Sequence, residues 1–362
     1  SQTARIPLEE ERLFNIGYLF LQQLCSELRL DNICRNIRNR HKFTYDFHAI
    51  LTDLIYARIL SPSSKMSSFS FCHSLLEAPK YSLQNVYRAL SVLAEESDYI
   101  QEELYTNFVH HRNSKILYYD CTNYYFEIEE ESGDKQYGKN KEHRPNPIVT
   151  MGLFMDADGI PLAFDIFPGN QNEQTSLKPL ESKILQQFGC DKFIYCSDAG
   201  LASQSNRNFN HMGKRAFIVT QSIKKLRKED KELALNGKNF RRLSDHKKVD
   251  LNSLEKDETD QLYYKEIPYT SGNLDQRLLI TYSPKYAAYQ KSIRDAQVER
   301  AKAMIQDGSY KKNRKNPNDP ARFIDKLAAT KDGEAADIHY YLDEEKVLEE
   351  SRYDGLYAVC TD

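Results

Sequence analysis

The order of strand and helix patterns between residues 116 and 220 restricts the fold of this chain more than any other sequence feature. Runs rich in β-branched and aromatic residues alternate there with helical runs, and turn residues separate them. In chain order, the patterns cover Ile116 to about Ile128, Ile148–Met155, Ile160–Phe167, Ser176–Phe188 (helical), Phe193–Asp198, Ser203–Met212 (helical) and Ala216–Thr220. The predicted order is βββαβαβ, which indicates an α/β fold with a mixed sheet.

The segment before this sheet has helical spacing of its apolar residues. Its first apolar face is formed by Leu13, Ile16, Leu19, Phe20 and Leu24. Further helical patterns run through Phe47–Leu60 and Gln84–Phe108, and a turn at residues 61–64 separates two of the helices. We therefore expect an all-helical N-terminal domain over residues 1–113, followed by the first part of the sheet domain over residues 114–222.

The chain beyond Lys224 is highly charged and mixed in pattern. Strand-like pieces occur at Leu262–Ile267 and Arg277–Tyr282, and a long helical pattern runs from Pro284 to about Ile305. We interpret residues 223–350 as an inserted α+β subdomain. Residues 351–362 then return to the sheet as one more strand. Because a natural domain rarely ends at a buried strand without a covering helix, we expect the natural protein to continue beyond this point.

Composition narrows the class of protein only slightly. A formal net charge of −3 means that contact with nucleic acid must come from local basic patches. Seven cysteines are scattered singly, without zinc-site spacing, which is typical of core thiols in a reducing cytoplasm. The sequence contains neither a membrane-length apolar run nor a signal-peptide pattern at its first residues, so we expect a cytoplasmic protein.

Two aspartates occupy related places in the predicted sheet. Asp120 lies along the first strand and Asp198 ends the fourth. A helical crossover after a three-strand meander should place the fourth strand beside the first and parallel to it. The two carboxylates can then converge, although an isolated Asp at a strand end is most often a cap or turn residue.

Paired carboxylates of this kind suit hard divalent cations, which prefer oxygen ligands. Two such ions roughly 4 Å apart can activate a water or hydroxyl nucleophile and stabilise the leaving oxygen of a phosphodiester. The following residues, among them Asn123 and Gly200, leave space and hydrogen-bonding capacity around the pair.

Several segments, in this order, resemble the insertion-sequence transposases of the DDE class found in bacteria. The matching segments are Tyr119–Glu127, Lys141–Pro147, Met151–Leu162, Phe167–Asn170 with Glu173, Ser197–Gly200 and Tyr353–Cys360. The resemblance covers roughly residues 47–362. It implies an RNase H-like catalytic core, Mg²⁺ or Mn²⁺ as cofactor with two ions in the complete site, and cutting and joining of double-stranded DNA at element ends and target. It also implies a homo-oligomer on DNA, with Asp120 and Asp198 as the first two acidic ligands.

The chain departs from that family at the third acidic ligand. In the family this ligand is a Glu on the helix after the returning strand, and the chain ends at Asp362, before such a helix. Asp362 is at the strand exit and is not a substitute. The acidic residues before the strand, Glu344, Glu345, Glu349 and Glu350, are interpreted as a solvated linker. The sequence thus predicts no third acidic ligand within the chain, and a chain that is inactive alone.

Basic residues in three places are candidates for DNA contact. Phosphate oxygens are the usual partners of such side chains. The candidates are Arg35, Arg38 and Arg40 in the helical domain, Lys141 and Arg144 after the first strand, and Lys224 and Lys225 at the start of the insertion. A solvated helix face or loop is the alternative interpretation for each of them.

Three functions remain open from the residues. The first is a DNA transposase. The second is an inactive DNA-binding or transposase-binding fragment that regulates transposition. The third is an RNase H-like nuclease that cuts without joining. Glycosidase chemistry by paired carboxylates is remote, because its usual folds do not have this strand order.

Overall fold

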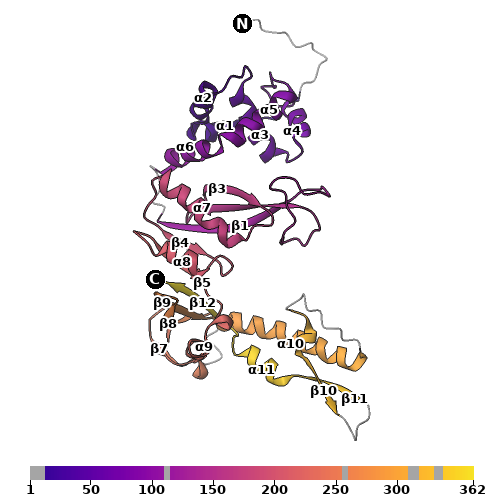
Figure 1. Cartoon of the computed structure of the whole chain (residues 1–362), viewed down its shortest axis with the longest axis vertical. Coiled ribbons are helices and arrows are strands. Elements are labelled where there is room, and N and C mark those ends of the chain that lie inside the picture. The colour runs from indigo at the N-terminus through magenta and orange to yellow at the C-terminus, as the bar shows by residue number, and fades with distance from the viewer. Residues whose placement is uncertain (1–12, 110–114, 255–259, 309–317, 330–336) are drawn as a thin grey trace. The chain divides into compact units, whose positions relative to one another are not determined.

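The computed structural model describes residues 13–109, 115–254, 260–308, 318–329 and 337–362 (Figure 1). Its contacts divide the chain into two compact units. The N-terminal unit comprises residues 1–115, 153–165 and 180–190, and the sheet unit comprises residues 116–152, 166–179 and 191–362. The boundaries of these two units differ from those of the four predicted segments. The organisation into four segments remains a prediction.

Six helices form the first part of the N-terminal unit. They are α1 (Leu19–Glu27), α2 (Leu30–Arg40), α3 (Phe47–Leu60), α4 (Lys65–Cys72), α5 (Leu83–Glu95) and α6 (Ser97–Val109). Side-chain caps fix where several of them begin: Asp46 caps α3, Ser64 caps α4 and Ser82 forms a capping box with Asn85 on α5. The expected N-terminal helices and the turn at 61–64 are confirmed, whereas a domain over residues 1–113 stays a prediction.

The predicted apolar face of the first helix is wrong. Helix α1 begins only at Leu19, after a turn at Gly17 and Tyr18, so residues 13–16 do not share its periodicity. Leu13, Phe20 and Leu24 are exposed, and the buried residues of this segment are Tyr18 and Cys25. The helical period is correct, but the predicted helix starts several residues too early.

The predicted helical run over residues 84–108 is two helices. Helix α5 ends at Glu95 and α6 starts at Ser97, because the chain leaves helical geometry at Glu96. The Glu96 carboxylate accepts hydrogen bonds from Arg40 and His41, which ties this break to the end of α2. A periodicity window cannot detect an interruption of one residue.

A ten-stranded sheet has the order β3-β2-β1-β4-β5-β12-β9-β8-β6-β7. Its strands are β1 (Ile116–Tyr125), β2 (Ile148–Met155), β3 (Pro161–Pro168), β4 (Ile194–Ser197), β5 (Ala216–Thr220), β6 (Phe240–Arg242), β7 (Lys248–Val249), β8 (Tyr263–Ser271), β9 (Leu274–Tyr282) and β12 (Leu356–Thr361). Helices α7 (Glu173–Gln186) and α8 (Gln204–Asn210) connect β3 to β4 and β4 to β5. The predicted βββαβαβ order is confirmed, and the chain is a mixed α/β protein with N-terminal helices and a large mixed sheet.

Within the sheet unit, one face of the sheet is buried and the other is exposed. Tyr119 on β1, Tyr195 on β4 and Phe217 on β5 are buried on one face. That face meets α7, because the Tyr119 hydroxyl lies 2.5 Å from the Ser176 hydroxyl. Residues of the opposite face, such as Tyr118, are exposed. Because side chains alternate along a strand, Asp120 points to this open face.

The expected insertion lies between β5 and β12 and contains a hairpin, a long helix and a separate two-stranded sheet. These parts are the β8–β9 hairpin, α9 (Lys228–Leu235), α10 (Pro284–Asp307, the long orange helix in Figure 1), the pair β10 (Ile324–Ala329) and β11 (Asp337–Leu342), and α11 (Glu344–Ser351). The interpretation of the acidic segment before the last strand as a linker is wrong. This segment forms helix α11, which Asp343 caps at its N-terminus. Among the described residues, no helix has the length and apolarity needed to cross a membrane.

Candidate functional site

The pairing of β1 with β4 brings the two predicted aspartates near the end of β4. The strands are parallel, with Tyr118 opposite Cys196. Asp120 lies two residues further along β1, and Asp198 directly follows β4, which ends at Ser197. Both residues are exposed. Because side chains alternate along β1, Asp120 lies on the open face of the sheet, and its convergence with Asp198 stays a prediction.

Backbone amides hold one oxygen of each carboxylate. The Asp120 Oδ1 accepts a hydrogen bond from its neighbour, the Cys121 N–H, at 2.8 Å. The Asp198 Oδ1 accepts from the N–H groups of Gly200, at 2.9 Å, and Leu201, at 3.1 Å. These contacts orient both side chains before any ligand arrives. The arrangement at Asp198 uses a tight turn, and a Cβ on Gly200 would lie 3.2 Å from the same oxygen.

Lys141 joins this pair in the structure. Its ammonium group donates a 2.8 Å hydrogen bond to the Cys121 carbonyl and lies 3.9 Å from the Asp120 Oδ2. The sequence singled out Lys141 for DNA contact but not for its proximity to Asp120, because 21 positions separate the two residues along the chain. Its position places a positive charge beside the carboxylates.

Arg144 is held in the loop after Lys141. The Arg144 guanidinium lies over the Tyr125 ring, 4.2 Å from its centroid, and its Nε is 2.9 Å from a Glu142 carboxylate oxygen. Asn140 fixes the backbone here, because its side chain hydrogen-bonds both the N–H and the carbonyl of Arg144. Arg144 is thus already engaged with an aromatic ring and a carboxylate, and its contact with DNA stays a prediction.

A cavity of about 610 Å³ lies next to the aspartates in the sheet unit. It is connected to both of them through its lining, since Lys141 contacts Asp120 and Gly200 contacts Asp198. The residues that line this cavity, here called the amide cavity, are Asn123, Tyr137, Gly138, Lys139, Asn140, Lys141, His143, Thr150, Gly169, Asn170, Gln171, Asn172, Glu173 and Gly200. The sequence had indicated hydrogen-bonding capacity at Asn123 but not the role of Tyr137 or the 170–172 turn, which no local pattern marks as part of a site.

The other predicted DNA contacts lie in α2 and at the start of the insertion. Arg35 pairs with Asp31 within α2 at 3.3 Å. Arg40 pairs with Glu96 and lies over the Tyr99 ring. Arg38 is exposed near the end of the same helix.

At the start of the insertion, Lys224 and Lys225 are exposed on a short 3-10 turn. The Lys224 ammonium lies 5.1 Å from the Tyr353 ring centroid. The structure does not bring these lysines into the lining of the amide cavity.

Asp362 lies away from the aspartate pair. Its carboxylate accepts a hydrogen bond from the Phe217 N–H at the start of β5 and lies 2.8 Å from the His211 ring. The parallel register of β4 and β5 puts Asp198 at the other end of these strands. Across the described residues, no group of three or more His, Cys, Asp or Glu side chains is arranged to hold a metal ion.

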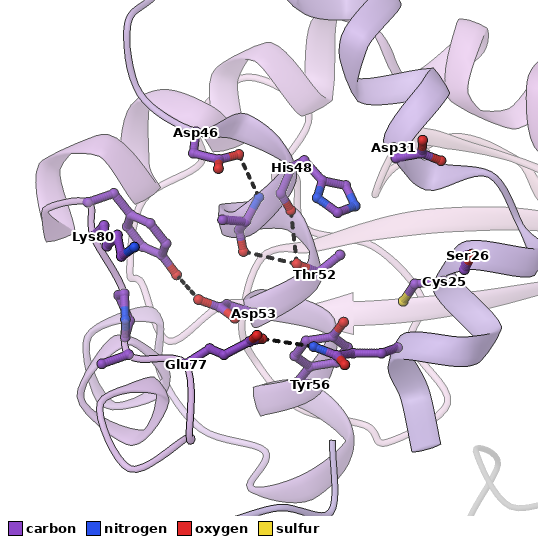
Figure 2. Close-up of a pocket in the computed structure, with 15 residues that line it drawn as sticks. Cys25, Ser26, Asp31, Asp46, His48, Thr52, Asp53, Tyr56, Glu77 and Lys80 are labelled. Atoms are coloured by element: carbon purple, nitrogen blue, oxygen red, sulfur yellow. Dashed lines mark hydrogen bonds between the residues drawn. The ribbon is translucent and has the colours of Figure 1, made fainter. Parts of the chain in front are cut away.

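A second cavity, of about 420 Å³, lies in the N-terminal unit (Figure 2). Four carboxylates line it, those of Asp31, Asp46, Asp53 and Glu77, and we call it the acidic cavity. Asp53 is the most buried of the four, and its Oδ2 accepts a 2.6 Å hydrogen bond from the Tyr81 hydroxyl, which Figure 2 shows as a dashed line. Burial raises the pKa of the Asp53 carboxyl, which the Tyr81 hydrogen bond partly offsets.

Comparison with known proteins gives structural matches and no sequence match. No protein-family model matches the chain, and no curated protein matches it either. Among solved structures, the chain is similar to the piggyBac transposase in a synaptic complex with hairpin DNA, at 11% sequence identity and a TM-score of 0.32. The match covers 72% of this chain, which spans about half (55%) of the length of that transposase chain.

Proposed function

We propose that this protein belongs to the DDE-type DNA transposases and that Asp120 and Asp198 hold the divalent metal, Mg²⁺ or Mn²⁺, that its chemistry requires. The observation that supports the proposal is the parallel pairing of β1 with β4, from which we infer that two exposed carboxylates, Asp120 on β1 and Asp198 directly after β4, converge at the end of β4. Its substrate is double-stranded DNA, whose phosphodiester bonds it cuts and rejoins as a homo-oligomer.

The donor set fits such an ion. Each carboxylate has its Oδ1 held by backbone N–H groups, so its Oδ2 is the oxygen that could take the ion. Hard cations take oxygen ligands of this type. When bound, a divalent ion supplies Lewis-acid stabilisation of charge on the phosphodiester and a more acidic nucleophile.

Lys141 supports a DNA substrate at the same place. The Lys141 ammonium group donates a hydrogen bond to the Cys121 carbonyl, which holds this charge in position. A phosphate that approaches Asp120 would meet this ammonium group, which would offset the repulsion between phosphate and carboxylate.

The first experiment is nicking of supercoiled plasmid by the 362-residue protein in Mg²⁺ or Mn²⁺, with Mn²⁺ affinity measured alongside by calorimetry. Because no third acidic ligand is predicted within this chain, we expect Mn²⁺ binding that Asp120→Ala and Asp198→Ala remove, and any nicking should require the metal and both aspartates. Asp275→Asn, an exposed aspartate on β9 of the same sheet, is the matched control and should change neither. Equal nicking by the protein and by Asp120→Ala would end the role proposed for Asp120.

Two other outcomes separate the remaining functions. DNA binding without metal-dependent nicking would favour the inactive regulatory fragment. Nicking without joining in a strand-transfer assay would favour a nuclease.

A further inference from the structure

We infer that the acidic cavity of the N-terminal unit binds an aliphatic polyamine, a small organic cation with several ammonium groups along one methylene chain. The inference does not depend on the proposed function, because the residues of this cavity belong to a different unit from Asp120 and Asp198. The cavity volume of about 420 Å³ is in the range of small-molecule sites. Its carboxylates determine the sign of the charge that the ligand carries.

Asp53 brings a buried charge to the cavity without a cation to balance it. The residue lies on α3, lines the cavity and is only 8% exposed. Its Oδ2 accepts the hydrogen bond from the Tyr81 hydroxyl. Within the described residues, its Oδ1 accepts no hydrogen bond and the carboxylate forms no ion pair. A buried carboxylate without a cation is unfavourable, and burial accordingly raises the pKa of Asp53. A cationic ligand would remove this cost.

Two further carboxylates act on Asp53 through their charge. After burial, which is the largest cause, repulsion from Glu77 and Asp46 also raises the pKa of the Asp53 carboxyl. Both residues line the cavity and are exposed, and in the described part of the chain neither forms an ion pair. The fourth carboxylate, Asp31, is paired with Arg35. Three carboxylates of the cavity are therefore not balanced by an ion pair.

The basic side chains of the lining do not neutralise these carboxylates. Lys80 is exposed and forms no ion pair with any described carboxylate of the cavity. His48 lowers the pKa of Asp53 through its charge, which is a smaller effect than the repulsion from Glu77 or Asp46. The lining therefore keeps a negative charge that attracts a cation.

Hydrogen bonds from the protein hold one oxygen of each unbalanced carboxylate, as the dashed lines in Figure 2 show. The donors are the Ala49 N–H to Asp46 at 3.0 Å, the Gln22 side-chain amide to Glu77 at 2.9 Å and the Tyr81 hydroxyl to Asp53 at 2.6 Å. An ionised carboxylate has two acceptor oxygens, so each can accept a further hydrogen bond from an ammonium group. Hydrogen bonds of this charged kind are the strong ones.

The separation of the carboxylates favours an extended cation over a metal ion. Across the described residues, no group of three or more acidic, His or Cys side chains is arranged to hold one ion. A chain with ammonium groups separated by methylene spacers can pair with carboxylates that lie apart. Its methylene groups would contact the apolar part of the lining, which includes Ala49, Ala78 and Pro79. A cation with one charge would balance Asp53 and leave the other carboxylates unpaired.

The test is calorimetric titration of the 362-residue protein with spermidine in moderate salt, where non-specific attraction is screened. Butylamine, which has a single ammonium group, and Mg²⁺ are the comparison ligands. We expect spermidine to bind at a single site. Butylamine should bind roughly 5- to 50-fold more weakly, because it lacks the further ion pairs. Mg²⁺ at equal concentration should not displace spermidine.

Variants assign the binding to the cavity. Asp53→Asn should weaken spermidine binding roughly 10- to 100-fold, because it removes the buried charge of the pair. Asp46→Asn keeps a side chain that can cap α3 and should weaken binding only a few-fold, since Asp46 is exposed. Asp275→Asn removes the same charge from an exposed position on β9 of the sheet unit, and this matched control should bind as the unaltered protein does.

Circular dichroism shows whether Asp53→Asn folds. If it does not, the double variant Asp46→Asn with Glu77→Gln takes its place, because both positions are exposed. Loss of these two charges should weaken spermidine binding roughly 2- to 30-fold and leave the helical signal unchanged.

Several results would overturn the polyamine site. They are no spermidine binding, equal affinity for spermidine and butylamine, displacement by Mg²⁺ at equal concentration, and unchanged affinity in Asp53→Asn or in the double variant. An equal loss of affinity in Asp275→Asn would overturn it as well, because spermidine would then respond only to the total charge of the protein. None of these results depends on plasmid nicking, so the polyamine site and the proposed function can fail separately.

Discussion

The acidic cavity, of about 420 Å³, and the amide cavity, of about 610 Å³, differ in charge. The acidic cavity is lined by four carboxylates with Lys80 and His48, whereas the amide cavity has two lysines and His143 against the single carboxylate of Glu173. A polyanion such as DNA is repelled by the first lining and accepted by the second. The volume of a cavity therefore does not indicate its ligand, whereas the charged groups that line it do.

The same comparison bears on the predicted DNA contacts of α2. Arg35 is paired with Asp31, which itself lines the acidic cavity. A phosphate at Arg35 would have to displace this carboxylate and approach three others. The charge at Lys141 is held beside the cavity that is not acidic. We therefore expect DNA affinity to depend more on Lys141 than on Arg35.

The largest expected difference concerns the carboxylates themselves. Asp198→Ala should reduce metal-dependent nicking on the order of 10³-fold, because loss of a metal ligand removes several kcal/mol of transition-state stabilisation. Glu77→Gln in the acidic cavity removes an exposed carboxylate that accepts a hydrogen bond from Gln22, and it should leave nicking unchanged. Plasmid nicking rates measure both. A comparable loss in Glu77→Gln would mean that the acidic cavity takes part in the chemistry.

The next largest effect is on stability and compares a buried hydroxyl with an exposed one. Tyr81→Phe removes the hydrogen bond to buried Asp53 and should lower the free energy of unfolding of the N-terminal unit by about 1–3 kcal/mol. Tyr137→Phe removes an exposed hydrogen bond to the Glu129 carbonyl and should cost less than about 1 kcal/mol. Urea unfolding followed by circular dichroism gives both values. Equal costs would show that Asp53 is better solvated than its burial indicates.

The sequence predicted the sheet well because each strand is defined locally. The bounds of β2 and β5 agree with the predicted ranges, since turn residues stop both patterns. The prediction from sequence failed where a single residue or a capping contact determines where a helix begins or ends. The break at Glu96 depends on partners in α2, and helix α11 depends on the Asp343 cap.

The candidate site shows the same limit. The parallel pairing of β1 with β4, on which the proposed convergence of Asp120 and Asp198 depends, follows from strand order and the handedness of the crossover, so it could be predicted before the structure. The position of Lys141 follows from a loop that Asn140 fixes, and the amide cavity combines residues from five separate parts of the chain, namely Asn123, residues 137–143, Thr150, residues 169–173 and Gly200. No periodicity encodes such contacts, because they depend on where the loop backbone turns.

DNA affinity should separate the two cavities more modestly. Lys141→Ala should weaken binding to duplex DNA a few-fold at low salt and reduce the slope of log affinity against log salt by about 1, as expected for one lost phosphate contact. Lys80→Ala, at an exposed lysine of the acidic cavity, is the control and should change neither quantity. Anisotropy titrations at several salt concentrations provide the slopes. A larger effect at Lys80 would move the DNA to the N-terminal unit.

The smallest expected effect is a pH dependence specific to the acidic cavity. Burial raises the pKa of the Asp53 carboxyl in the folded protein. Between the unfolded pKa and this raised pKa, the folded state binds more protons than the unfolded state, so its free energy of unfolding rises as pH falls through that window. Asp53→Asn has no such proton. The unaltered protein should therefore gain stability relative to Asp53→Asn as pH is lowered from neutral, measured by urea unfolding at a series of pH values.

The difference in the free energy of unfolding between the unaltered protein and Asp53→Asn isolates the contribution of Asp53. Glu77, Asp46 and His48 act on its charge and are present in both proteins, so their own contributions cancel to first order. The amide cavity provides a further control, because Glu173→Gln should not reproduce the effect in the helical signal. Parallel curves for Asp53→Asn and the unaltered protein would mean that Tyr81 and the surrounding water compensate fully for burial. The acidic cavity would then be electrostatically equivalent to the surface, and the contrast between the two cavities would depend on charge number alone.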